Sequence, residues 1–416
     1  MAELTRKDIE LMAPVGSYES LMAAIQGGAD SVYFGVEKLN MRSQSSFNFT
    51  LEDLEKIVTI CKEHGIKSYL TVNCILYDED IATMHEIIDH AKKAGITAII
   101  ASDQAAITYA RSVGTEVHIS TQLNVSNTET LRFYAAFADV VVLARELNLK
   151  QVRHIYDEIR KQNIRGPHGE LIKIEMFAHG ALCMAVSGKC YLSLHDADKS
   201  ANRGSCRQIC RRAYEVRDKD TGAELLIENQ YIMSPKDLCT IDFLDELLEA
   251  GVRVLKIEGR ARSAEYVKRV CECYDEAINA VIDGSFSNES VAKWKEKLST
   301  VFNRGFWGGY YLGQKLGEWS RHYGSSATKK KVYVGKVTNF FKKLSVAEIL
   351  IEAAPLQTGE ELIILGETTG VVELKAEEIR VDLMPVQTAV QGEKCSLVTP
   401  QLVRRGDKLY KLTDKN

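Results

Sequence analysis

The chain lacks the features that mark membrane and secreted proteins. Its 416 residues contain no run of about 18 apolar residues, so no segment is expected to span a membrane. The N-terminal stretch, MAELTRKDIELMAP, has neither the apolar core nor the cleavage site of a signal peptide. We therefore expect a cytoplasmic protein with no membrane partner, whose cysteine thiols stay reduced.

The chain also lacks a net positive charge and the common hydrolase motifs. The formal net charge is −4, so any contact with RNA would depend on local basic patches rather than on overall charge. The zinc-protease pattern His-Glu-x-x-His is absent, because His85 and Glu86 are not followed by a histidine at position 89. No Gly-x-Ser-x-Gly turn is present to hold a serine nucleophile. These absences count against the common hydrolase classes.

Cysteine, by contrast, is concentrated in one segment. Four of the ten cysteines fall within 28 residues, namely Cys183, Cys190, Cys206 and Cys210. Thiols at this density bind zinc or an iron–sulfur cluster, or pair as disulfides, and a reducing compartment disfavours the disulfides. Zinc sites usually use two tight pairs, only one of which is present here, and the ferredoxin spacing is absent as well. The spacing leaves zinc and iron–sulfur open, with Cys239 as an alternative fourth ligand in place of Cys210.

The first 285 residues alternate short β-branched runs with amphipathic helical stretches. Runs such as Val140–Val142 are typical of strands that are buried on both faces. Eight strand–helix units over about 280 residues predict an α/β fold, a closed TIM-like (β/α)8 barrel, with a doubly wound open sheet as the alternative. The predicted strands are Glu10–Pro14, Ser31–Gly35, Ser68–Asn73, Ala98–Ser102, Glu116–Ser120, Asp139–Ala144, Ile174–His179 and Arg253–Gly259.

An excess of about 70 residues separates the seventh and eighth predicted strands, and it contains all four clustered cysteines. In a barrel this cysteine-bearing insertion, at about 181–235, leaves the C-terminal end of a strand, which is the face where barrel active sites lie. We therefore expect the cysteine cluster to cap the mouth of the barrel.

The last part of the chain has a different character. After a connector at 286–331, which ends in three lysines, residues 332–416 contain short strand-like runs separated by turn signals such as Thr358 with Gly359. About eighty residues of this kind predict a small all-β barrel domain. The expected organisation is therefore a barrel with its insertion at 1–285, the connector, and a C-terminal β-domain.

Several segments of the predicted barrel resemble one known family. Glu175–Ser193 reads EMFAHGALCMAVSGKCYLS and is similar, residue by residue, to the signature of the peptidase U-32 (collagenase-like) family. Within that family the chain is most similar to the TrhP-type tRNA uridine hydroxylation proteins. The likeness spans nearly the whole barrel. Its other segments are Glu10–Ser17, Gly28–Gly35, Asn202–Tyr214 and Lys256–Ser263.

The resemblance implies an iron–sulfur, RNA-modifying enzyme. The implied cofactor is a [4Fe–4S] cluster held by Cys183, Cys190, Cys206 and Cys210. The implied reaction is oxygen-independent synthesis of 5-hydroxyuridine at the wobble position of tRNA, with prephenate as the small carboxylate donor. tRNA and the iron–sulfur assembly machinery are the implied partners. A collagenase-like peptidase, a hydroxylase of another RNA or of a quinone precursor, and a tRNA-binding module with a structural metal remain alternatives.

Polar residues at the ends of the predicted strands are candidates for the chemistry, because these ends meet at the mouth of a barrel. Guanidinium groups pair bidentately with carboxylates, so arginines at the mouth suit a dicarboxylate. His179 and Glu258 are the candidate catalytic residues, Glu258 either as a base or as the group that orients Arg260. Substrate contacts are predicted for Arg145, Arg260, Gln122, His118 and Asn73.

The cysteine segment is also strongly basic. Five basic residues and no acidic ones occur from Lys199 to Arg212. They suit the phosphates of RNA, which would make binding dependent on salt, and they equally suit the negative charge of a thiolate-ligated cluster. The predicted RNA contacts are Arg203, Arg207, Arg211 and Arg212.

Overall fold

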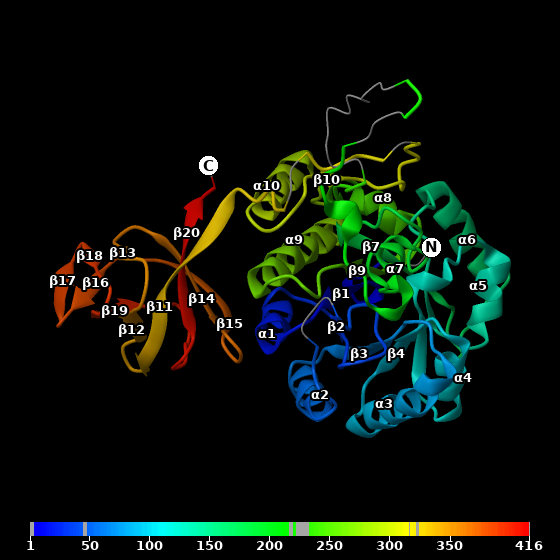
Figure 1. Cartoon of the computed structure of the whole chain (residues 1–416), viewed down its shortest axis with the longest axis horizontal. Coiled ribbons are helices and arrows are strands. Elements are labelled where there is room, and N and C mark those ends of the chain that lie inside the picture. Colours follow the sequence, from blue (N-terminus) through cyan, green and yellow to red (C-terminus); the bar gives the residue numbers. More distant parts are fainter. Residues whose placement is uncertain are drawn as a thin grey trace.

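The computed structural model describes residues 4–44, 48–215, 219–221, 233–315, 317–321 and 324–415. Eight parallel strands pair in sequence order, and the last of them pairs with both β7 and β1, so this sheet closes into a barrel (Figure 1). The predicted TIM-like barrel is confirmed, and the doubly wound alternative is wrong. Its strands are β1 (Glu10–Pro14), β2 (Ser31–Phe34), β3 (Lys67–Val72), β4 (Ala98–Ala101), β5 (Glu116–Ile119), β6 (Val140–Val142), β7 (Lys173–Ala181) and β9 (Val252–Ile257).

The barrel strands form where short runs are buried on both faces. Every residue of β1, β2, β4 and β6 is buried. Side chains that point inward from different strands, such as Met12, Tyr69 and Val254, pack together inside the barrel. Side chains of the opposite parity pack outward against the helices, as the parallel sheet of a barrel requires.

Helices follow the strands and cover the outside of the barrel (Figure 1). Several begin at a polar N-cap, as at Asn148, whose side chain accepts a hydrogen bond from the backbone N–H of Gln151. Among the described residues, no helix has the length and apolar character needed to cross a bilayer. The helices are α1 (Tyr18–Gln26), α2 (Asp53–Glu63), α3 (Ile81–Ala94), α4 (Gln104–Ser112), α5 (Thr128–Ala135), α6 (Leu149–Lys161), α8 (Leu244–Glu249) and α9 (Ala264–Asp283).

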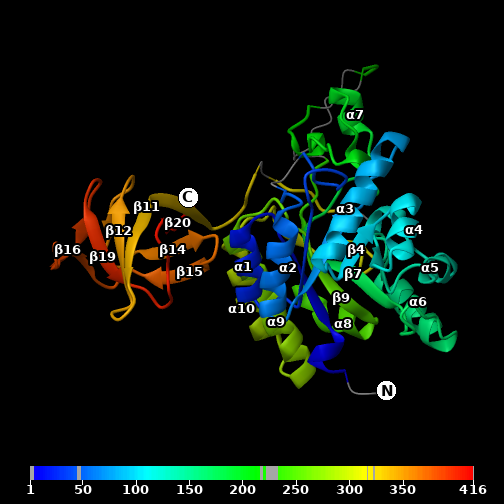
Figure 2. The same ribbon diagram turned by 90° about the horizontal axis from the view of Figure 1, so that it is seen from below.

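The insertion between β7 and β9 adds structure at one end of the barrel. It carries the short helix α7 (Leu192–Ala197), which lies at the end opposite the N-terminus (Figure 2). The insertion returns through β8 (Asp237–Cys239), antiparallel to β7, and β8 pairs with β10 (Phe306–Trp307). The sequence analysis predicted neither β8 nor β10, because runs of three and two residues give no periodic signal.

The C-terminal part is an antiparallel β-unit, as predicted. Its main sheet has the order β15-β14-β20-β11-β12-β19-β16-β17, and a separate pair joins β13 and β18. β11 begins at Lys329, so the three lysines at the predicted end of the connector are the first residues of this strand. The strands are β11 (Lys329–Phe341), β12 (Val346–Ile351), β13 (Leu356–Gln357), β14 (Glu361–Gly366), β15 (Gly370–Lys375), β16 (Ile379–Val381), β17 (Met384–Val386), β18 (Thr388–Ala389), β19 (Lys394–Val398) and β20 (Lys408–Asp414).

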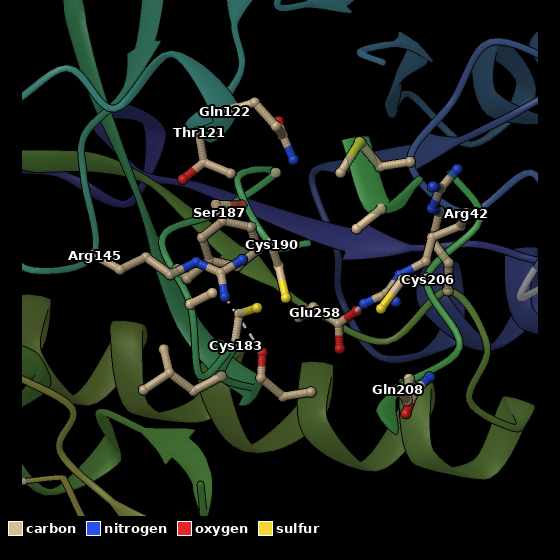
Figure 3. A pocket seen from close by; sticks show the side chains of 18 of the residues that line it. Arg42, Thr121, Gln122, Arg145, Cys183, Ser187, Cys190, Cys206, Gln208 and Glu258 are labelled. Carbon is tan, nitrogen blue, oxygen red and sulfur yellow. Dashed lines mark hydrogen bonds and ion pairs between the residues drawn. The ribbon is translucent and has the colours of Figure 1, made fainter. Parts of the chain in front are cut away.

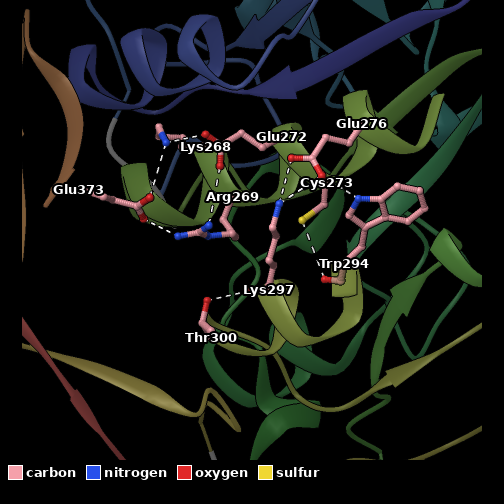
Figure 4. Close-up of polar contacts among 9 residues, drawn as sticks. All are labelled: Lys268, Arg269, Glu272, Cys273, Glu276, Trp294, Lys297, Thr300 and Glu373. Carbon is pink, nitrogen blue, oxygen red and sulfur yellow. Dashed lines mark hydrogen bonds and ion pairs between the residues drawn. The ribbon is translucent and has the colours of Figure 1, made fainter. Parts of the chain in front are cut away.

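This β-unit packs against the outside of the barrel, away from the insertion (Figure 2). Glu373 of β15 forms ion pairs with Lys268 and Arg269 of α9 (Figure 4). Nearby, Gln26 at the end of α1 donates to the carbonyl of Thr369 and accepts from the backbone N–H of Val371, both at 2.9 Å. Helix α10 (Asn288–Ser299) packs on α9 beside this contact through Trp294, which donates to Glu276 at 2.8 Å.

Candidate active site at the mouth of the barrel

A cavity of about 210 Å³ lies where the C-terminal ends of the barrel strands meet the insertion (Figure 3). Its walls come from β2, β3, β4, β6, β7 and β9 and from the loops after β2 and β5. β7 and β9 approach closely at Gly180, whose φ is +110°, and a Cβ there would lie 2.4 Å from the carbonyl oxygen of Glu258. Glycine at this position therefore lets the chain turn out of β7 into the cysteine-bearing insertion.

All four clustered cysteines line this one cavity, whereas the other six cysteines do not. All ten are free thiols, so the disulfide interpretation is wrong for the described structure. Burial raises the pKa of the Cys210 thiol; Arg211 acts in the opposite direction, and Cys183, Cys206 and Cys190 raise it further.

The donor set at the mouth suits a thiolate-ligated cofactor. Four cysteines are the ligand complement of a [4Fe–4S] cluster and also of a structural zinc site. Within the described ranges, no three Cys, His, Asp or Glu side chains are arranged as the ligands of a single metal ion. This includes the four cavity thiols, which supply the ligand type that such a cofactor needs but are not set at the coordination geometry of a single ion.

The cavity is strongly cationic. Among the described residues its lining contains one carboxylate, that of Glu258, and six guanidinium groups. Positive charge beside cysteine favours the thiolate form, which is the form that binds metal. The same charge attracts an anionic ligand. The arginines are Arg42, Arg145, Arg211, Arg260, Arg262 and Arg304.

Glu258 is paired with an arginine that the sequence analysis did not identify. Its Oε1 lies 2.7 Å from Nη2 of Arg42. Burial alone would raise the pKa of Glu258, but Arg42, Arg262 and Arg145 together lower it to about 2. A carboxylate held ionised in this way is a weak base at neutral pH. Its contacts favour a role in positioning Arg42 over the predicted role as a general base.

Arg260 does not pair with Glu258, although the sequence analysis raised that pairing. Its guanidinium donates to Thr71 Oγ1 and to Asn40 Oδ1, each at 3.1 Å. Burial lowers the pKa of Arg260 to about 10. The side chain is only 6% exposed, so its guanidinium forms the inner wall of the cavity rather than an open contact.

Three further predicted substrate residues also reach the cavity. Asn73, at the end of β3, accepts from the backbone N–H of Met41 at 3.1 Å and donates to Ser120 Oγ at 3.2 Å. Gln122, just after β5, accepts a hydrogen bond from Ser120. Arg145, just after β6, lies over the ring of Phe177 at 3.9 Å. The barrel ends bring these three side chains to one cavity, as expected of its C-terminal face.

The two predicted histidines lie elsewhere. His179 packs among Tyr266, Tyr274 and Phe306 and is 2% exposed, and it is not part of the cavity lining. Burial, with Arg262 adding to it, lowers the pKa of His179 to about 3, so the ring is neutral. This placement does not favour the predicted catalytic role. The sequence could not predict this placement, because the pattern around a histidine at the end of a strand is the same whether its side chain points into the cavity or behind it.

His118 lies deeper inside the barrel than predicted. Its Nε2 is 3.1 Å from Glu116 Oε1, at the end of β5 remote from the mouth, and its ring packs on Tyr69 at 4.6 Å. It is 1% exposed and absent from the cavity lining. The geometry therefore does not favour the predicted substrate contact at His118.

Cys239 also lies outside the cavity, although it was the alternative fourth ligand. It pairs with His179 in the β7–β8 register and is 3% exposed. Burial raises the pKa of Cys239 to about 11, as expected of a structural thiol. Of the two candidates for the fourth position, only Cys210 lines the cavity.

The four predicted RNA-binding arginines divide into two pairs. Arg203 forms an ion pair with Asp80 and lies over the ring of Tyr77 at 4.1 Å. Arg211 donates to the backbone carbonyls of Leu182 and Pro235 and lines the cavity. Arg207 and Arg212, in contrast, are exposed and remain available for phosphates, although Arg212 lies 3.8 Å from Asp196.

Sequence reasoning missed several cavity residues. Arg42 comes from the long loop after β2, where no periodic pattern indicates which way a side chain points. Arg262 was detectable in principle, because it follows Arg260 by two residues just past the eighth barrel strand. Arg304 comes from the connector and pairs with the buried Asp237 at 3.2 Å, a contact between distant segments.

Comparison with known proteins identifies relatives of two kinds. Residues 16–321 match the model of peptidase family U32. A protein named collagenase, from Porphyromonas gingivalis, is 63% identical over 97% of this chain and 98% of its own length. tRNA hydroxylation protein P1 of Bacillus subtilis is 33% identical over 81% of this chain and 78% of its own. A 23S rRNA 5-hydroxycytidine synthase of Escherichia coli is 34% identical over 66% of this chain and 40% of its own.

Proposed function

Because the chain belongs to peptidase family U32, we propose that it is an iron–sulfur enzyme that hydroxylates RNA, with the wobble uridine of tRNA as its substrate. The observation that carries this proposal is the position of the four free thiols, which line a single cationic cavity at the mouth of the barrel. Relatives named for tRNA and rRNA hydroxylation support the choice of reaction. The barrel mouth is where enzymes of this fold bind their substrates.

Cys183, Cys190, Cys206 and Cys210 would hold a [4Fe–4S] cluster in this proposal. When bound, such a cluster, with a cysteine for each of its irons, would supply electron transfer. The protein contributes the arginines around the thiols, which offset the negative charge of a thiolate-ligated group in a low-dielectric site. Delivery of iron and sulfide by the assembly machinery, in the cytoplasm, follows from the same proposal.

Prephenate, a dicarboxylate, is the proposed co-substrate. Six guanidinium groups against one carboxylate leave the cavity with excess positive charge, which suits an anion of this size. The cavity volume of about 210 Å³ is enough for a small organic acid but not for a folded nucleic acid. The RNA would therefore present one nucleotide at the mouth while the rest of it lies on the surface, as base-modifying enzymes require.

The surface beside the mouth suits this arrangement. Tyr191 is 77% exposed directly after Cys190, and the neighbouring Met184 and Leu192 are exposed as well. Aromatic side chains at such positions stack on unpaired bases. Arg207 and Arg212 are exposed in the same insertion and supply the charge that phosphates require.

Two measurements test the proposal. The protein is purified without oxygen, its iron and sulfide are determined, and its visible absorbance is recorded. Nucleosides from bulk tRNA are then compared by mass spectrometry between cells with and without the gene, with rescue by the wild type or by Cys183→Ser. The proposal expects iron, and 5-hydroxyuridine that disappears on deletion and returns only with the wild type. Four zinc-bound thiolates with no iron, or unchanged nucleosides, would overturn it.

Peptide hydrolysis is the second candidate, because a 63% identical relative is named collagenase. A cysteine peptidase needs a thiol beside a histidine that a third group fixes. Among the described residues no histidine hydrogen-bonds a cysteine, and His179 is held neutral in the core. Cleavage of gelatin by the wild type, abolished by Cys183→Ala, would establish this candidate in place of the first.

A further inference from the structure

Most of the cavity arginines already have partners in the protein. Arg42 pairs with Glu258 at 2.7 Å and Arg304 with Asp237 at 3.2 Å. Two more arginines hydrogen-bond neutral groups through two nitrogens each. Arg260 donates to Thr71 and Asn40. Arg211 donates to backbone carbonyls. Carboxylates offset the charge of Arg42 and Arg304, and hydrogen bonds fix Arg260 and Arg211 in place before any ligand arrives. Arg262 lies over the ring of Phe302 at 3.5 Å.

Arg145 differs from them. No carboxylate of the described residues forms an ion pair with it, and its single hydrogen bond is a long one, 3.4 Å from Nη1 to the carbonyl of Ala181. Its Nε is buried and has no hydrogen-bond partner. The guanidinium carbon lies 3.9 Å from the ring centroid of Phe177, a contact that uses none of the N–H groups. Arg145 therefore presents unused donors to the cavity (Figure 3).

Two more donors lie on the same wall. Thr121 is 5% exposed, and its hydroxyl Oγ1 is buried without a hydrogen-bond partner. Gln122 accepts from Ser120 through Oε1, which leaves its amide N–H2 group pointing into the cavity (Figure 3). A buried polar group without a partner is unfavourable, so a ligand that hydrogen-bonds these groups recovers that free energy.

We propose that Arg145, Thr121 and Gln122 form a subsite that binds a carboxylate of the small organic co-substrate. The proposal deepens the function proposed above and rests on it. The three side chains follow β5 and β6 and line the same cavity as Cys183 and Cys190, and the guanidinium of Arg145 is directed toward Cys183 (Figure 3). A co-substrate anchored here would lie with its remaining atoms toward the cysteines.

The donors themselves select this occupant. The guanidinium and the amide nitrogen only donate, and the hydroxyl can donate as well. An ionised carboxylate only accepts, and its two oxygens match the edge of a guanidinium bidentately. A uracil ring would bring an N3–H donor, for which only the Thr121 hydroxyl could serve as an acceptor. An RNA phosphate accepts too, but the subsite lies inside the cavity rather than along the exposed surface where a backbone would run.

Binding measured without catalysis tests the subsite. Titration calorimetry is run with prephenate, with malonate as a plain dicarboxylate, and with uridine 5′-monophosphate as the nucleotide probe. The variants are Arg145→Gln, Arg145→Lys and Thr121→Val. The matched control is Arg253→Gln, since Arg253 also lies over an aromatic ring, that of Tyr156, but at the opposite end of the barrel from the cavity. Circular dichroism checks that each variant is folded.

We expect Arg145→Gln to raise the Kd for prephenate by at least about 10-fold, because a bidentate charge-assisted contact is lost. Arg145→Lys should recover only part of this, since an ammonium cannot make the bidentate contact. Thr121→Val should raise the Kd about 3- to 5-fold. Arg253→Gln should leave it unchanged, and binding of uridine monophosphate should be unaffected by all four substitutions.

Three results would overturn the subsite. These are an unchanged prephenate Kd in folded Arg145→Gln, weakened nucleotide binding in place of weakened carboxylate binding, and a wild type that binds neither dicarboxylate at millimolar concentration. Failure of the proposed function gives different results. If the protein binds prephenate through Arg145 but tRNA nucleosides are unchanged, the subsite proposal stands and the RNA hydroxylation proposal is wrong. If the protein hydroxylates tRNA but Arg145→Gln binds prephenate as tightly as the wild type, only the subsite proposal is wrong.

Discussion

The two ends of the barrel interior differ in how their charges are balanced. At the end remote from the mouth, which we call the floor, charges are matched in pairs. Glu10 accepts from Lys67 and from Tyr69, each at 2.7 Å. Glu175, with no exposed surface, pairs at 2.6 Å with Lys256, whose side chain reaches up to the cavity and is part of its lining. Burial opposes ionisation of Glu10, but Lys67 and Tyr69 lower its pKa below the ordinary value.

At the mouth, by contrast, the cationic groups far outnumber the single carboxylate of Glu258. Unmatched charge in a partly buried site costs stability unless a ligand neutralises it. The comparison indicates that the floor charges serve the barrel itself, while the mouth charges serve an anionic occupant. This matches the general division of labour in barrels, in which chemistry lies at the C-terminal face.

The largest effect is expected from removing a mouth thiol. Cys183→Ser should abolish iron retention and lower 5-hydroxyuridine in tRNA by at least roughly 100-fold, because loss of a ligand exceeds the 10- to 100-fold effect of outer-shell changes. Iron analysis and nucleoside mass spectrometry measure the two losses. Cys395→Ala is the matched control, because Cys395 is buried in β19 of the β-unit and should leave both readouts intact. Wild-type iron in Cys183→Ser would contradict the assignment of this ligand.

The floor should respond in stability rather than in activity. Glu175→Gln leaves Lys256 charged, buried and without its partner, which should cost about 3–5 kcal/mol in the free energy of unfolding. Urea denaturation at neutral pH measures it. Glu116→Gln is the comparison, because the Glu116 side chain is 28% exposed and its loss should cost less than about 1 kcal/mol. Equal costs for the two variants would remove the distinction between a matched floor and an open mouth.

Acid should weaken the Glu258–Arg42 ion pair of the mouth, which resembles the matched pairs of the floor. The pKa of Glu258 is about 2 in the folded protein and about 4.3 in an unfolded chain. The unfolded state therefore binds the proton first. The contribution of Glu258, roughly 2–3 kcal/mol, is fully present above about pH 5 and is lost as the pH falls toward 2.

Urea denaturation of the wild type and Glu258→Gln over this pH range measures that contribution directly. The stability difference between the two proteins should shrink steadily as the solution is acidified. A difference that stays constant from neutral pH to pH 3 would show that the Glu258–Arg42 pair is not held as the structure describes it.

The sequence predicted the barrel well because buried parallel strands leave a direct trace. Runs such as Val140–Val142 identify a strand and its burial together, and all eight predicted strands form with ends that shift by a few residues. The mouth location of the cysteines followed from chain order alone, since an insertion after β7 must leave the C-terminal face. Short pairings such as β8 with β10 depend on contacts between distant segments, which no local pattern reports.

Individual site residues were harder to predict, because the direction of a strand-end side chain depends on packing. Arg145 and Gln122 point into the cavity, whereas His179 turns toward an aromatic cluster behind it. The basic run from Lys199 to Arg212 shows the same limit. Its charges look equivalent in sequence, yet Arg203 and Arg211 are engaged by Asp80 and by backbone carbonyls.

The smallest predicted effect is on RNA binding at the rim of the mouth, where some arginines are paired within the protein and others are exposed. Arg207→Ala should weaken tRNA binding about 2- to 5-fold and lower the slope of log Kd against log salt by about one contact. Arg212→Ala should do less, because Asp196 at 3.8 Å already offsets part of its charge. Arg203→Ala is the control, because Asp80 already pairs with Arg203. The salt slope should therefore not change, whereas the insertion should become less stable. Arg203→Ala could instead lower the salt slope as much as Arg207→Ala does. The Arg203–Asp80 pair would then open to bind phosphate. Charges that are paired within the protein would in that case also bind ligands, contrary to the comparison of the two barrel ends.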